Sequence, residues 1–319
     1  MKTFCTAALM AVAATAYQEF AVDELAEQRN LQSYREDNMN TKINDWWRFY
    51  FQQDCGAQQP QWDPMLVGNQ TEVTRPGPNQ VFNNNYTQFV DDTTGRATAV
   101  PKGEHKFTLI WLHGQTGTGD RAKGLFAGPI PTVPPTTKII LPTARENYMT
   151  NNNAIGNSWF DLWSQAERTG NETTEEFREG SCAKDIRNTW PYIHSLINQA
   201  IEELDGDASK VFVGGISQGH ATMLPAFLTY SDATLGGAFF LGGSLPIKLD
   251  YDMEVDLDIV RNVRFEVYND EAESAAIFTS LAQASYSDLE DKGLDYAVRT
   301  GPYGFDDFAA QVDVVRQFF

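Results

Sequence analysis

The C-terminal two thirds of the chain alternates short apolar runs with segments of helical periodicity. Six runs have the length and apolar character of buried strands: 107–112, 138–141, 211–216, 237–241, 263–268 and 295–299. A long helix is predicted between the second and third runs, because six large apolar residues recur there every three or four positions and share one face. These are Ile186, Trp190, Ile193, Ile197, Ile201 and Leu204. Pro191 is the expected place of any kink in this helix.

Further helical patterns follow residue 217, cover residues 272–289 and close the chain at 307–318. Strands with two apolar faces that alternate with helices are typical of a parallel sheet covered on both sides. The sequence therefore predicts an α/β fold with a mostly parallel sheet and helices on both faces.

Residues 17–103 have a different character. They are rich in Gln, Asn and Asp, contain turn signals at 75–79, and show a helical pattern at 21–35 and an aromatic cluster at 46–51. We expect an N-terminal extension ahead of a main domain at 104–319. Clustered Trp and Phe side chains usually become buried, so docking onto the main domain is favoured over a recognition surface.

The first sixteen residues predict a secretory signal peptide. Lys2 precedes an apolar run that ends in Ala-Thr-Ala at 14–16, a pattern that signal peptidase cleaves. The run is too short to span a bilayer, and no later stretch approaches the roughly 20 apolar residues of a transmembrane helix. We expect a protein that is secreted or held in the lumen of the secretory pathway, with a buried N-terminal helix as the alternative.

Secretion changes the interpretation of the cysteines and of three Asn-x-Ser/Thr sequons. Removal of Cys5 with the signal leaves Cys55 and Cys182, an even pair that predicts a disulfide in an oxidising compartment, with two separate thiols as the alternative. The sequons predict glycosylation in polar, turn-rich segments. They are centred on Asn69, Asn85 and Asn171.

The charge and the scarcity of ligating residues exclude several functions. A net charge of −19 repels phosphate backbones and anionic lipids, so we expect no nucleic-acid partner. With four His and three Cys, and no glycine-rich loop carrying a phosphate-binding Lys, the sequence predicts neither a metal site nor a cofactor.

Residues 215–219 read Gly-Ile-Ser-Gln-Gly, a G-x-S-x-G motif centred on Ser217. The motif directly follows a predicted strand and precedes a helical segment, where a sharp turn needs small flanking residues and presents the serine as a nucleophile. The N–H of Gln218 then points to the place where a tetrahedral oxyanion forms. A second donor is expected from Gln115, in the turn after strand 107–112. The alternative is a Gly-Ser turn without chemistry.

Four segments together resemble the phospholipase/carboxylesterase family, which includes the acyl-protein thioesterases. They are Leu-His-Gly at 112–114, Leu-Pro-Thr-Ala at 141–144, Ser-Trp-Phe-Asp at 158–161 and Gly-Gly-Ile-Ser-Gln-Gly at 214–219. The resemblance covers residues 104–319 and leaves 17–103 outside. It implies an α/β-hydrolase domain that cleaves esters or thioesters of acyl chains with a Ser-Asp-His triad.

The chain departs from this pattern at two triad positions. The acid is expected in the loop after strand 263–268, where Asp270 and Glu271 are the candidates. The histidine is expected just before the C-terminal helix, where this chain has Phe305. No histidine follows residue 220, so no shift of alignment supplies one.

The four histidines present are therefore the remaining candidates for a base. His113, in the turn after strand 107–112, is expected to pack and form hydrogen bonds, His194 to lie on the long helix, and His105 to be solvated. His220 follows Ser217 by three residues on the next helix, and we expect it to pack there rather than act as a base.

Three functions remain open. The first is a secreted, catalytically inactive hydrolase fold that serves as a binding or structural module, with extracellular protein or glycan partners or an acyl ester ligand. The second is an active esterase or thioesterase with a non-standard base. The third is a carbohydrate- or surface-binding protein that uses the aromatic cluster at 46–51.

Overall fold

The computed structural model describes ten segments of the chain. They are residues 71–72, 85–91, 95–127, 132–149, 154–161, 181–243, 245–270, 286–294, 296–301 and 308–319. The chain divides into two compact units, 1–61 and 62–319, and every described residue belongs to the second. The signal peptide, the helix at 21–35, the aromatic cluster, Cys55, Asn69, Asn171, Glu271 and Phe305 lie outside the described residues.

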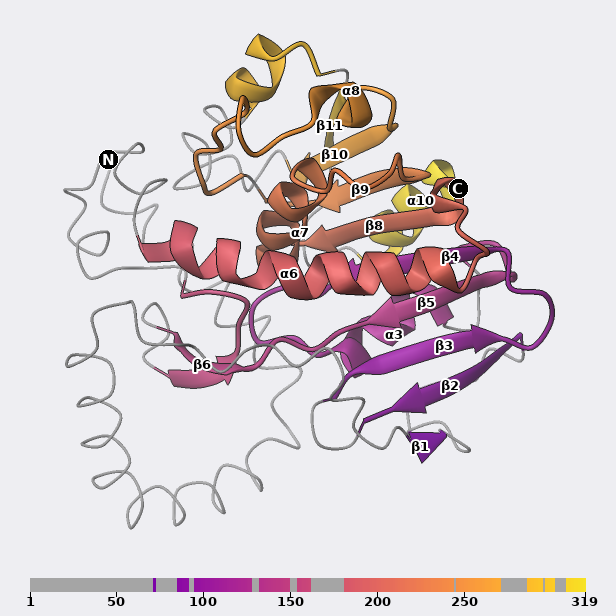
Figure 1. Cartoon of the computed structure of the whole chain (residues 1–319). Helices are drawn as coiled ribbons and strands as arrows, with labels where there is room; N and C mark the ends of the chain where they lie inside the picture. Colours follow the sequence, from indigo (N-terminus) through magenta and orange to yellow (C-terminus); the bar gives the residue numbers. More distant parts are fainter. Residues whose placement is uncertain are drawn as a thin grey trace. The chain divides into compact units, whose positions relative to one another are not determined.

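A single large sheet organises the described part of the second unit (Figure 1). Its six parallel strands are β4 (Phe107–Leu112), β5 (Thr137–Leu141), β8 (Val211–Ile216), β9 (Gly237–Leu241), β10 (Phe265–Asp270) and β11 (Tyr296–Gly301). They lie side by side in the order β5-β4-β8-β9-β10-β11. All six correspond to the predicted apolar runs, and this α/β architecture is confirmed.

Three further strands extend the sheet beyond β5. These are β1 (Thr71–Glu72), β2 (Tyr86–Val90) and β3 (Ala97–Pro101), which pair antiparallel in the order β1-β2-β3-β5. They come from the segment treated as an extension in the sequence, so the sheet begins before residue 104. Their short, partly polar sequences lack the continuous apolar run that marks a central parallel strand. A separate antiparallel hairpin pairs β6 (Glu146–Met149) with β7 (Ala154–Asn157).

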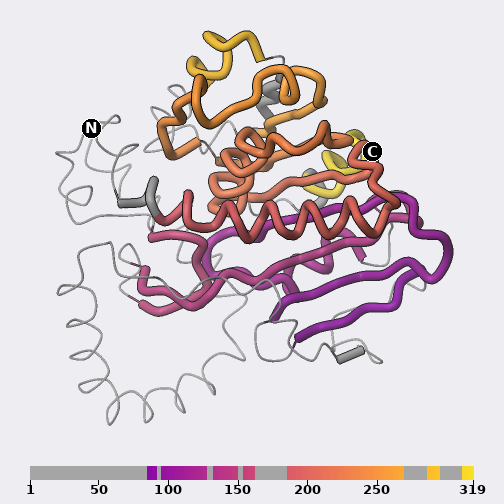
Figure 2. Tube along the Cα trace, in the orientation of Figure 1, coloured from indigo at the N-terminus to yellow at the C-terminus, as the bar shows by residue number. Residues whose placement is uncertain are grey.

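Helices cover both faces of the sheet (Figures 1 and 2). The helices α6 (Ser181–Glu202) and α7 (Gln218–Leu228) pack on one face, and α3 (Gly119–Ala127) and α10 (Phe308–Phe318) on the other. The alternation along β4 follows from its pleat: Ile110 and Leu112 join the core under α6, whereas Leu109 and Trp111 join the core under α3.

The long helix predicted around Pro191 is α6, and its predicted apolar face is buried or partly buried against the sheet. Two short helical turns, η1 (Ala208–Lys210) and α8 (Leu257–Val260), and a helical segment at 286–291 complete the described elements. Of the helix predicted at 272–289, only residues 286–289 lie within the described part. None of the described helices combines the length and the apolar character needed to cross a bilayer.

Candidate active site

Ser217 is the single residue between β8 and α7, and its backbone is strained. Because β8 ends at Ile216 and α7 begins at Gln218, the chain changes direction at one residue. Ser217 has φ 56° and ψ −121°, a conformation that costs about 1–3 kcal/mol for a residue with a side chain. Its N–H donates to the carbonyls of Leu241 and Gly242, at 3.0 and 2.8 Å. The half-buried serine therefore sits on the sharp turn that the motif predicts.

The glycines of the motif are required by close backbone approaches. A Cβ on Gly215 would lie 2.5 Å from the backbone of Gly219, and a Cβ on Gly219 would lie 2.2 Å from the carbonyl oxygen of Leu112. Any larger residue would push α7 away from β8 and β4. The two glycines thus let the helix start directly above the ends of both strands.

The turn after β4 lies against the serine side chain. A Cβ on Gly114 would lie 3.2 Å from Cβ and 3.7 Å from Oγ of Ser217. Gln115, one predicted oxyanion donor, is the next residue, and Gln218, the other, is the first residue of α7. The fold therefore brings the two turns that carry these residues together at one serine.

The side chain of Gln218 holds the Ser-Trp-Phe segment in place. It is buried, its Oε1 accepts from the Trp159 N–H at 2.9 Å, and its Nε2 donates to the Phe160 carbonyl at 2.6 Å and to Ser158 Oγ at 2.9 Å. In turn, Trp159 Nε1 donates to the carbonyl of His113 at 2.8 Å. The sequence predicts only a backbone role for Gln218, as an oxyanion donor. The presence of both the Ser-Trp-Phe-Asp segment and the G-x-S-x-G motif was the signal that could have indicated a contact between the Gln218 side chain and that segment.

His113 is buried and fully engaged with the backbone. Its Nε2 accepts from the Ala144 N–H at 2.9 Å, and its Nδ1 lies 2.6 Å from the carbonyl oxygen of Gly114. Burial lowers the pKa of His113 to about 4, so the ring is neutral near pH 7. His113 therefore fills the packing and hydrogen-bonding role expected from the sequence and has no ring nitrogen left to serve as a base.

His220 is fully buried and stacks on Phe240, with ring centroids 5.0 Å apart. Among the described residues neither ring nitrogen has a hydrogen-bond partner, Ser217 included. Burial lowers the pKa of His220 to about 3; the backbone of Leu241 opposes this slightly without reaching hydrogen-bond geometry. A Cβ on Gly243 would lie 2.7 Å from Nδ1, so the ring also fills the space beside the loop after β9.

The other two histidines are engaged elsewhere. His194 on α6 lies with Nε2 2.7 Å from the carbonyl oxygen of Ala226 and meets the edge of Tyr230. His105 precedes β4, at the end of the sheet opposite Ser217, and its Nε2 lies 2.9 Å from Thr108 Oγ1. None of the four histidines is therefore hydrogen-bonded to the serine.

Comparison with known proteins identifies the family. A profile of the family described as Phospholipase/Carboxylesterase matches residues 94–261, more than half of the chain. The chain belongs to the phospholipase/carboxylesterase family. The match includes the turn after β4, the Ser-Trp-Phe-Asp segment and the Ser217 turn described above.

Curated relatives in this family are esterases and thioesterases. The chain is 31% identical to carboxylesterase SOBER1 of Arabidopsis thaliana over 144 residues, which is 43% of this chain and 57% of the relative. It is 27% identical to acyl-protein thioesterase 1 of Debaryomyces hansenii over 172 residues, 51% of this chain and 66% of the relative. The aligned part thus spans little more than half of the first relative's length.

Solved structures of the phospholipase/carboxylesterase family share the fold. SOBER1 of Arabidopsis thaliana superposes with a TM-score of 0.52 at 20% identity, covering 66% of this chain and 95% of its own. Acyl-protein thioesterase 2 of Zea mays gives a TM-score of 0.53 at 20% identity, covering 70% and 96%. At this identity the likeness establishes the α/β-hydrolase fold.

The acid and the base are the two remaining triad positions of a phospholipase/carboxylesterase-family protein. Of the residues predicted for them, Asp270 lies within the described part of the chain. Asp270 is the last residue of β10, two strands from β8, and pairs in register with Gly301 of β11. Its backbone thus lies at the carboxyl edge of the sheet, as does Ser217. Glu271 and Phe305 lie outside the described residues. The choice of acid therefore stays a prediction.

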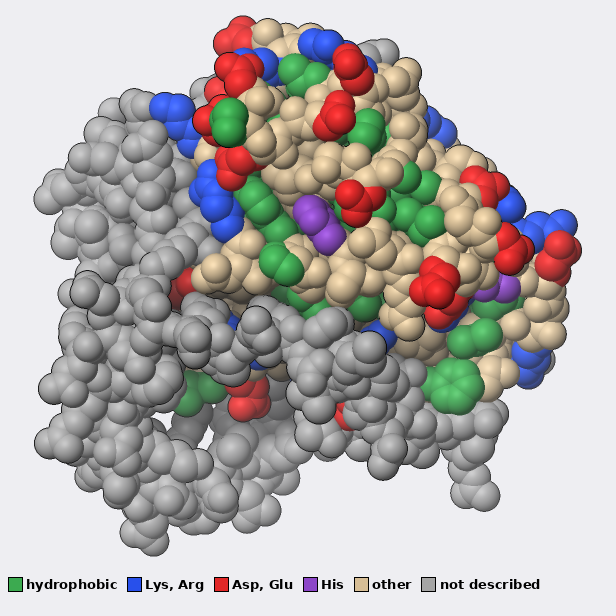
Figure 3. Space-filling model, in the orientation of Figure 1, with side chains coloured by type: hydrophobic (Ala, Val, Ile, Leu, Met, Phe, Trp, Pro, Cys, Tyr) green, Lys and Arg blue, Asp and Glu red, His purple; other side chains and the backbone are tan. Residues whose placement is uncertain are grey.

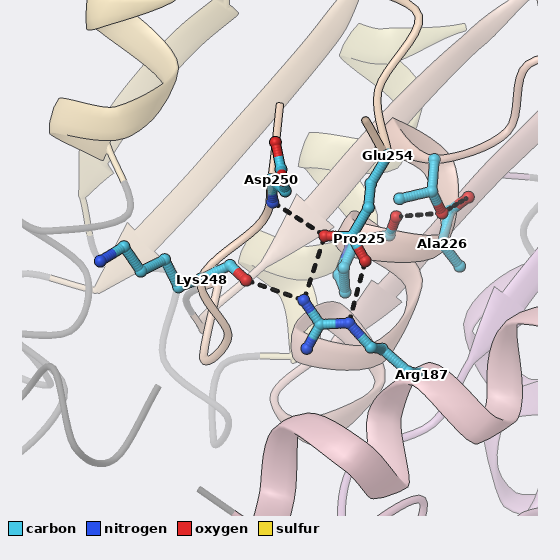
Figure 4. A network of polar contacts seen from close by, with 7 residues as sticks. Arg187, Pro225, Ala226, Lys248, Asp250 and Glu254 are labelled. Carbon is cyan, nitrogen blue, oxygen red and sulfur yellow. Dashed lines mark hydrogen bonds and ion pairs between the residues drawn. The ribbon is translucent and has the colours of Figure 1, made fainter. Parts of the chain in front are cut away.

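A second polar region is formed by residues outside the motifs of this family member. A cavity of about 590 Å³ is lined by Arg187, residues 248–252, Asp288, Asp291 and Lys292. Arg187 of α6 forms two contacts with Glu254, Nε to Oε1 at 3.0 Å and Nη2 to Oε2 at 3.1 Å, and also donates to the Lys248 carbonyl (Figure 4).

Acidic and basic side chains are interspersed on the face shown in Figure 3, and neither kind forms a patch of its own. No three His, Cys, Asp or Glu side chains come together as metal ligands in the described segments.

Proposed function

We propose that this chain is a secreted member of the family that binds an acyl ester or related acyl ligand at Ser217 without hydrolysing it at enzymatic rates, and that it acts as an extracellular binding module. One observation carries the loss of turnover: no histidine follows residue 220, and none of the four histidines of the chain is hydrogen-bonded to Ser217. Three of them are held in other contacts, and His220 is buried without a hydrogen bond to the serine.

The expected cost of a missing base is large. A serine hydroxyl is a weak nucleophile unless a neighbouring group accepts its proton. Removal of a triad member lowers turnover by a factor of about 10⁴–10⁶. The rate acceleration that remains comes from the oxyanion donors and from substrate binding. The ligand-binding half of the site is supported independently, because both turns that carry Gln115 and Gln218 lie beside Ser217.

Secretion rests on the N-terminal pattern of residues 1–16 and on features that suit an oxidising compartment. Asn85 is an exposed turn residue directly before β2, the kind of surface position at which a glycan is attached. Cys182 lies in the first turn of α6, and its proposed partner Cys55 lies outside the described residues. Intact and reduced mass spectrometry of protein secreted from a eukaryotic host tests the signal cleavage, the glycans and the Cys55–Cys182 disulfide together.

A working esterase or thioesterase with a non-standard base is the second candidate. The strained backbone of Ser217 favours it, because such strain persists when the surrounding structure enforces it and is common at active sites. In this alternative Asp270 or Glu271 supplies the acid, and a group other than a C-terminal histidine accepts the serine proton.

Hydrolysis of p-nitrophenyl acetate and butyrate separates the two candidates. We expect purified full-length protein and its Ser217→Ala variant to hydrolyse both esters at the same, near-background rate. Turnover at ordinary esterase rates that Ser217→Ala abolishes would overturn the proposal and establish the active enzyme. Labelling of Ser217 by a fluorophosphonate, beside an active control hydrolase, gives a second measurement that does not depend on the choice of ester.

A further inference from the structure

We propose that His113 is a positioning residue, whose ring orients the Gly114–Gln115 peptide so that the Gln115 N–H faces a negatively charged oxygen bound at Ser217. The inference deepens the proposed function and rests on Ser217 being the ligand site. It concerns anion binding, so it does not depend on whether the serine turns over an ester.

The hydrogen bonds determine which ring nitrogen of His113 carries the proton. A backbone amide can only donate, so the contact of the Ala144 N–H with Nε2, at 2.9 Å, requires Nε2 to be the acceptor. In a neutral imidazole the proton is then on Nδ1. Nδ1–H therefore donates to the Gly114 carbonyl, 2.6 Å away.

That carbonyl is held by two donors. The Gly117 N–H also donates to it, at 3.1 Å. In a planar trans peptide the C=O and the following N–H point in opposite directions. Fixing the Gly114 carbonyl towards His113 and Gly117 therefore fixes the Gln115 N–H in the opposite direction. Gly114 itself lies against Ser217, since a Cβ there would be 3.7 Å from Oγ.

A buried network ties this turn to the other predicted donor. Trp159 Nε1 donates to the His113 carbonyl at 2.8 Å, and the two rings lie 5.1 Å apart. The Trp159 N–H donates in turn to the Gln218 side chain at 2.9 Å. The turns that carry Gln115 and Gln218 follow different strands, yet two hydrogen bonds of one tryptophan join them, one to the His113 carbonyl and one to the Gln218 side chain. Such preorganisation is what makes an oxyanion site effective.

Two substitutions divide the two functions of the His113 ring. In His113→Asn the side-chain amide nitrogen takes the place of Nδ1 and can still donate to Gly114, but the contact with Ala144 is lost. In His113→Gln the side-chain oxygen reaches the place of Nε2 and can still accept from Ala144, but the donor to Gly114 is lost. A purely structural role predicts equal effects, because each variant loses one buried hydrogen bond.

Phenylboronic acid is the probe, because its binding at equilibrium needs no catalytic base. Serine Oγ adds to the trigonal boron, an O–B bond forms, the hydroxyl proton is released to buffer, and the tetrahedral boronate carries the negative charge. We would titrate 15N-labelled full-length protein at pH 8 and follow the amide resonances of Gln115 and Gln218, with Ser217→Ala as the control that cannot form the bond.

We expect both amide resonances to shift in the wild type, and the dissociation constant of His113→Gln to exceed that of His113→Asn at least tenfold at similar Tm. Equal constants for the two variants, or a wild-type complex in which Gln115 does not shift, would overturn the positioning role. So would the absence of any boronate binding by wild type. None of these results changes the ester-hydrolysis result that tests the proposed function.

Trp159→Phe provides a further test if either His113 variant fails to fold. It removes the indole N–H from the His113 carbonyl and keeps an aromatic ring in the core. We expect a severalfold weaker boronate complex with a reduced shift at Gln115. An unchanged dissociation constant would count against the network.

Discussion

Two polar regions of this molecule are built in opposite ways. Around Ser217 the polar groups are neutral and buried, and His113, Trp159 and Gln218 bind one another or the backbone. Around Arg187 and Glu254 the groups are charged and partly exposed, with side chains 34% and 24% accessible (Figure 4). The first region is therefore held together by packing and by the direction of its hydrogen bonds, and the second by the attraction between opposite charges.

The difference determines how much each region contributes to the free energy of unfolding. Breaking a buried hydrogen bond leaves a desolvated group unpaired, at a cost of about 1–3 kcal/mol. A partly exposed ion pair contributes about 0–1 kcal/mol and is screened by salt. We therefore expect changes near Ser217 to have large effects and changes near Glu254 to have small ones.

Mild acid should produce the largest effect. The pKa values of His113 and His220 are about 4 and 3 in the folded protein, against 6.5 ordinarily, so between pH 6.5 and about 4 the unfolded chain binds more protons. The free energy of unfolding is then highest above pH 6.5 and falls by roughly 5 kcal/mol as the pH drops to 4.5. Urea unfolding at pH 7.5, 6.0, 5.0 and 4.5 measures this.

The Glu254 carboxyl gives the contrast within that experiment. Its hydrogen bonds with Arg187 hold its pKa below the ordinary 4.5, so the stability that it contributes is lost only below that pH. A stability that stays constant from pH 7.5 to 4.5 would show that the buried imidazoles do not resist protonation.

Supplying the missing base should produce the largest kinetic effect. Phe305 stands where the family resemblance places the histidine, so Phe305→His should raise Ser217-dependent hydrolysis of p-nitrophenyl butyrate by about 10²–10⁴. Phe305→Gln, which cannot accept the proton, and the double variant with Ser217→Ala are the controls. A rate unaffected by the new histidine would mean that the acid or the oxyanion side of the site is also incomplete.

Removing the Gln218 amide should destabilise the fold strongly. Gln218→Leu removes the acceptor of the Trp159 N–H and one of the two donors to the Phe160 carbonyl, which keeps its bond from Ser158 Oγ. We expect a loss of about 2–4 kcal/mol in the free energy of unfolding. Thr222→Val on the same helix removes a single hydroxyl bond to the Gln218 carbonyl and should cost about 1 kcal/mol. Similar losses in the two variants would argue against the network.

Replacing His220 should stabilise the fold rather than destabilise it. Its two buried ring nitrogens have no partner among the described residues, so His220→Leu should raise the free energy of unfolding by about 1–2 kcal/mol and reduce the acid sensitivity by one proton. His194→Leu is the control, because His194 contacts the Ala226 carbonyl and its loss should destabilise. Destabilisation by His220→Leu would reveal a partner essential to the core.

Breaking the exposed ion pair should have the smallest effect. Glu254→Gln keeps the size of the side chain and removes its charge beside Arg187, so we expect at most about 1 kcal/mol, shrinking at high salt. Urea unfolding with and without added NaCl measures it. A loss as large as that of Gln218→Leu would erase the distinction between the two regions.

The parallel strands and the long helix could be predicted because their patterns are local. Strands such as β4 and β8 are continuous apolar runs, and α6 carries its apolar residues at helical spacing. The strands β2 and β3 escaped prediction, since antiparallel strands at one side of a sheet alternate polar with apolar residues and have no strong signature in so short a run.

The sequence by itself determined the position of the nucleophile and the absence of a downstream histidine. The first follows from a motif with strict steric demands at Gly215 and Gly219, and the second is a count. Tertiary structure alone decided what the existing histidines do. The contacts of His113 with Ala144 and Trp159 join residues 31 and 46 positions apart. Such contacts depend on how strands and turns pack, which no local pattern specifies.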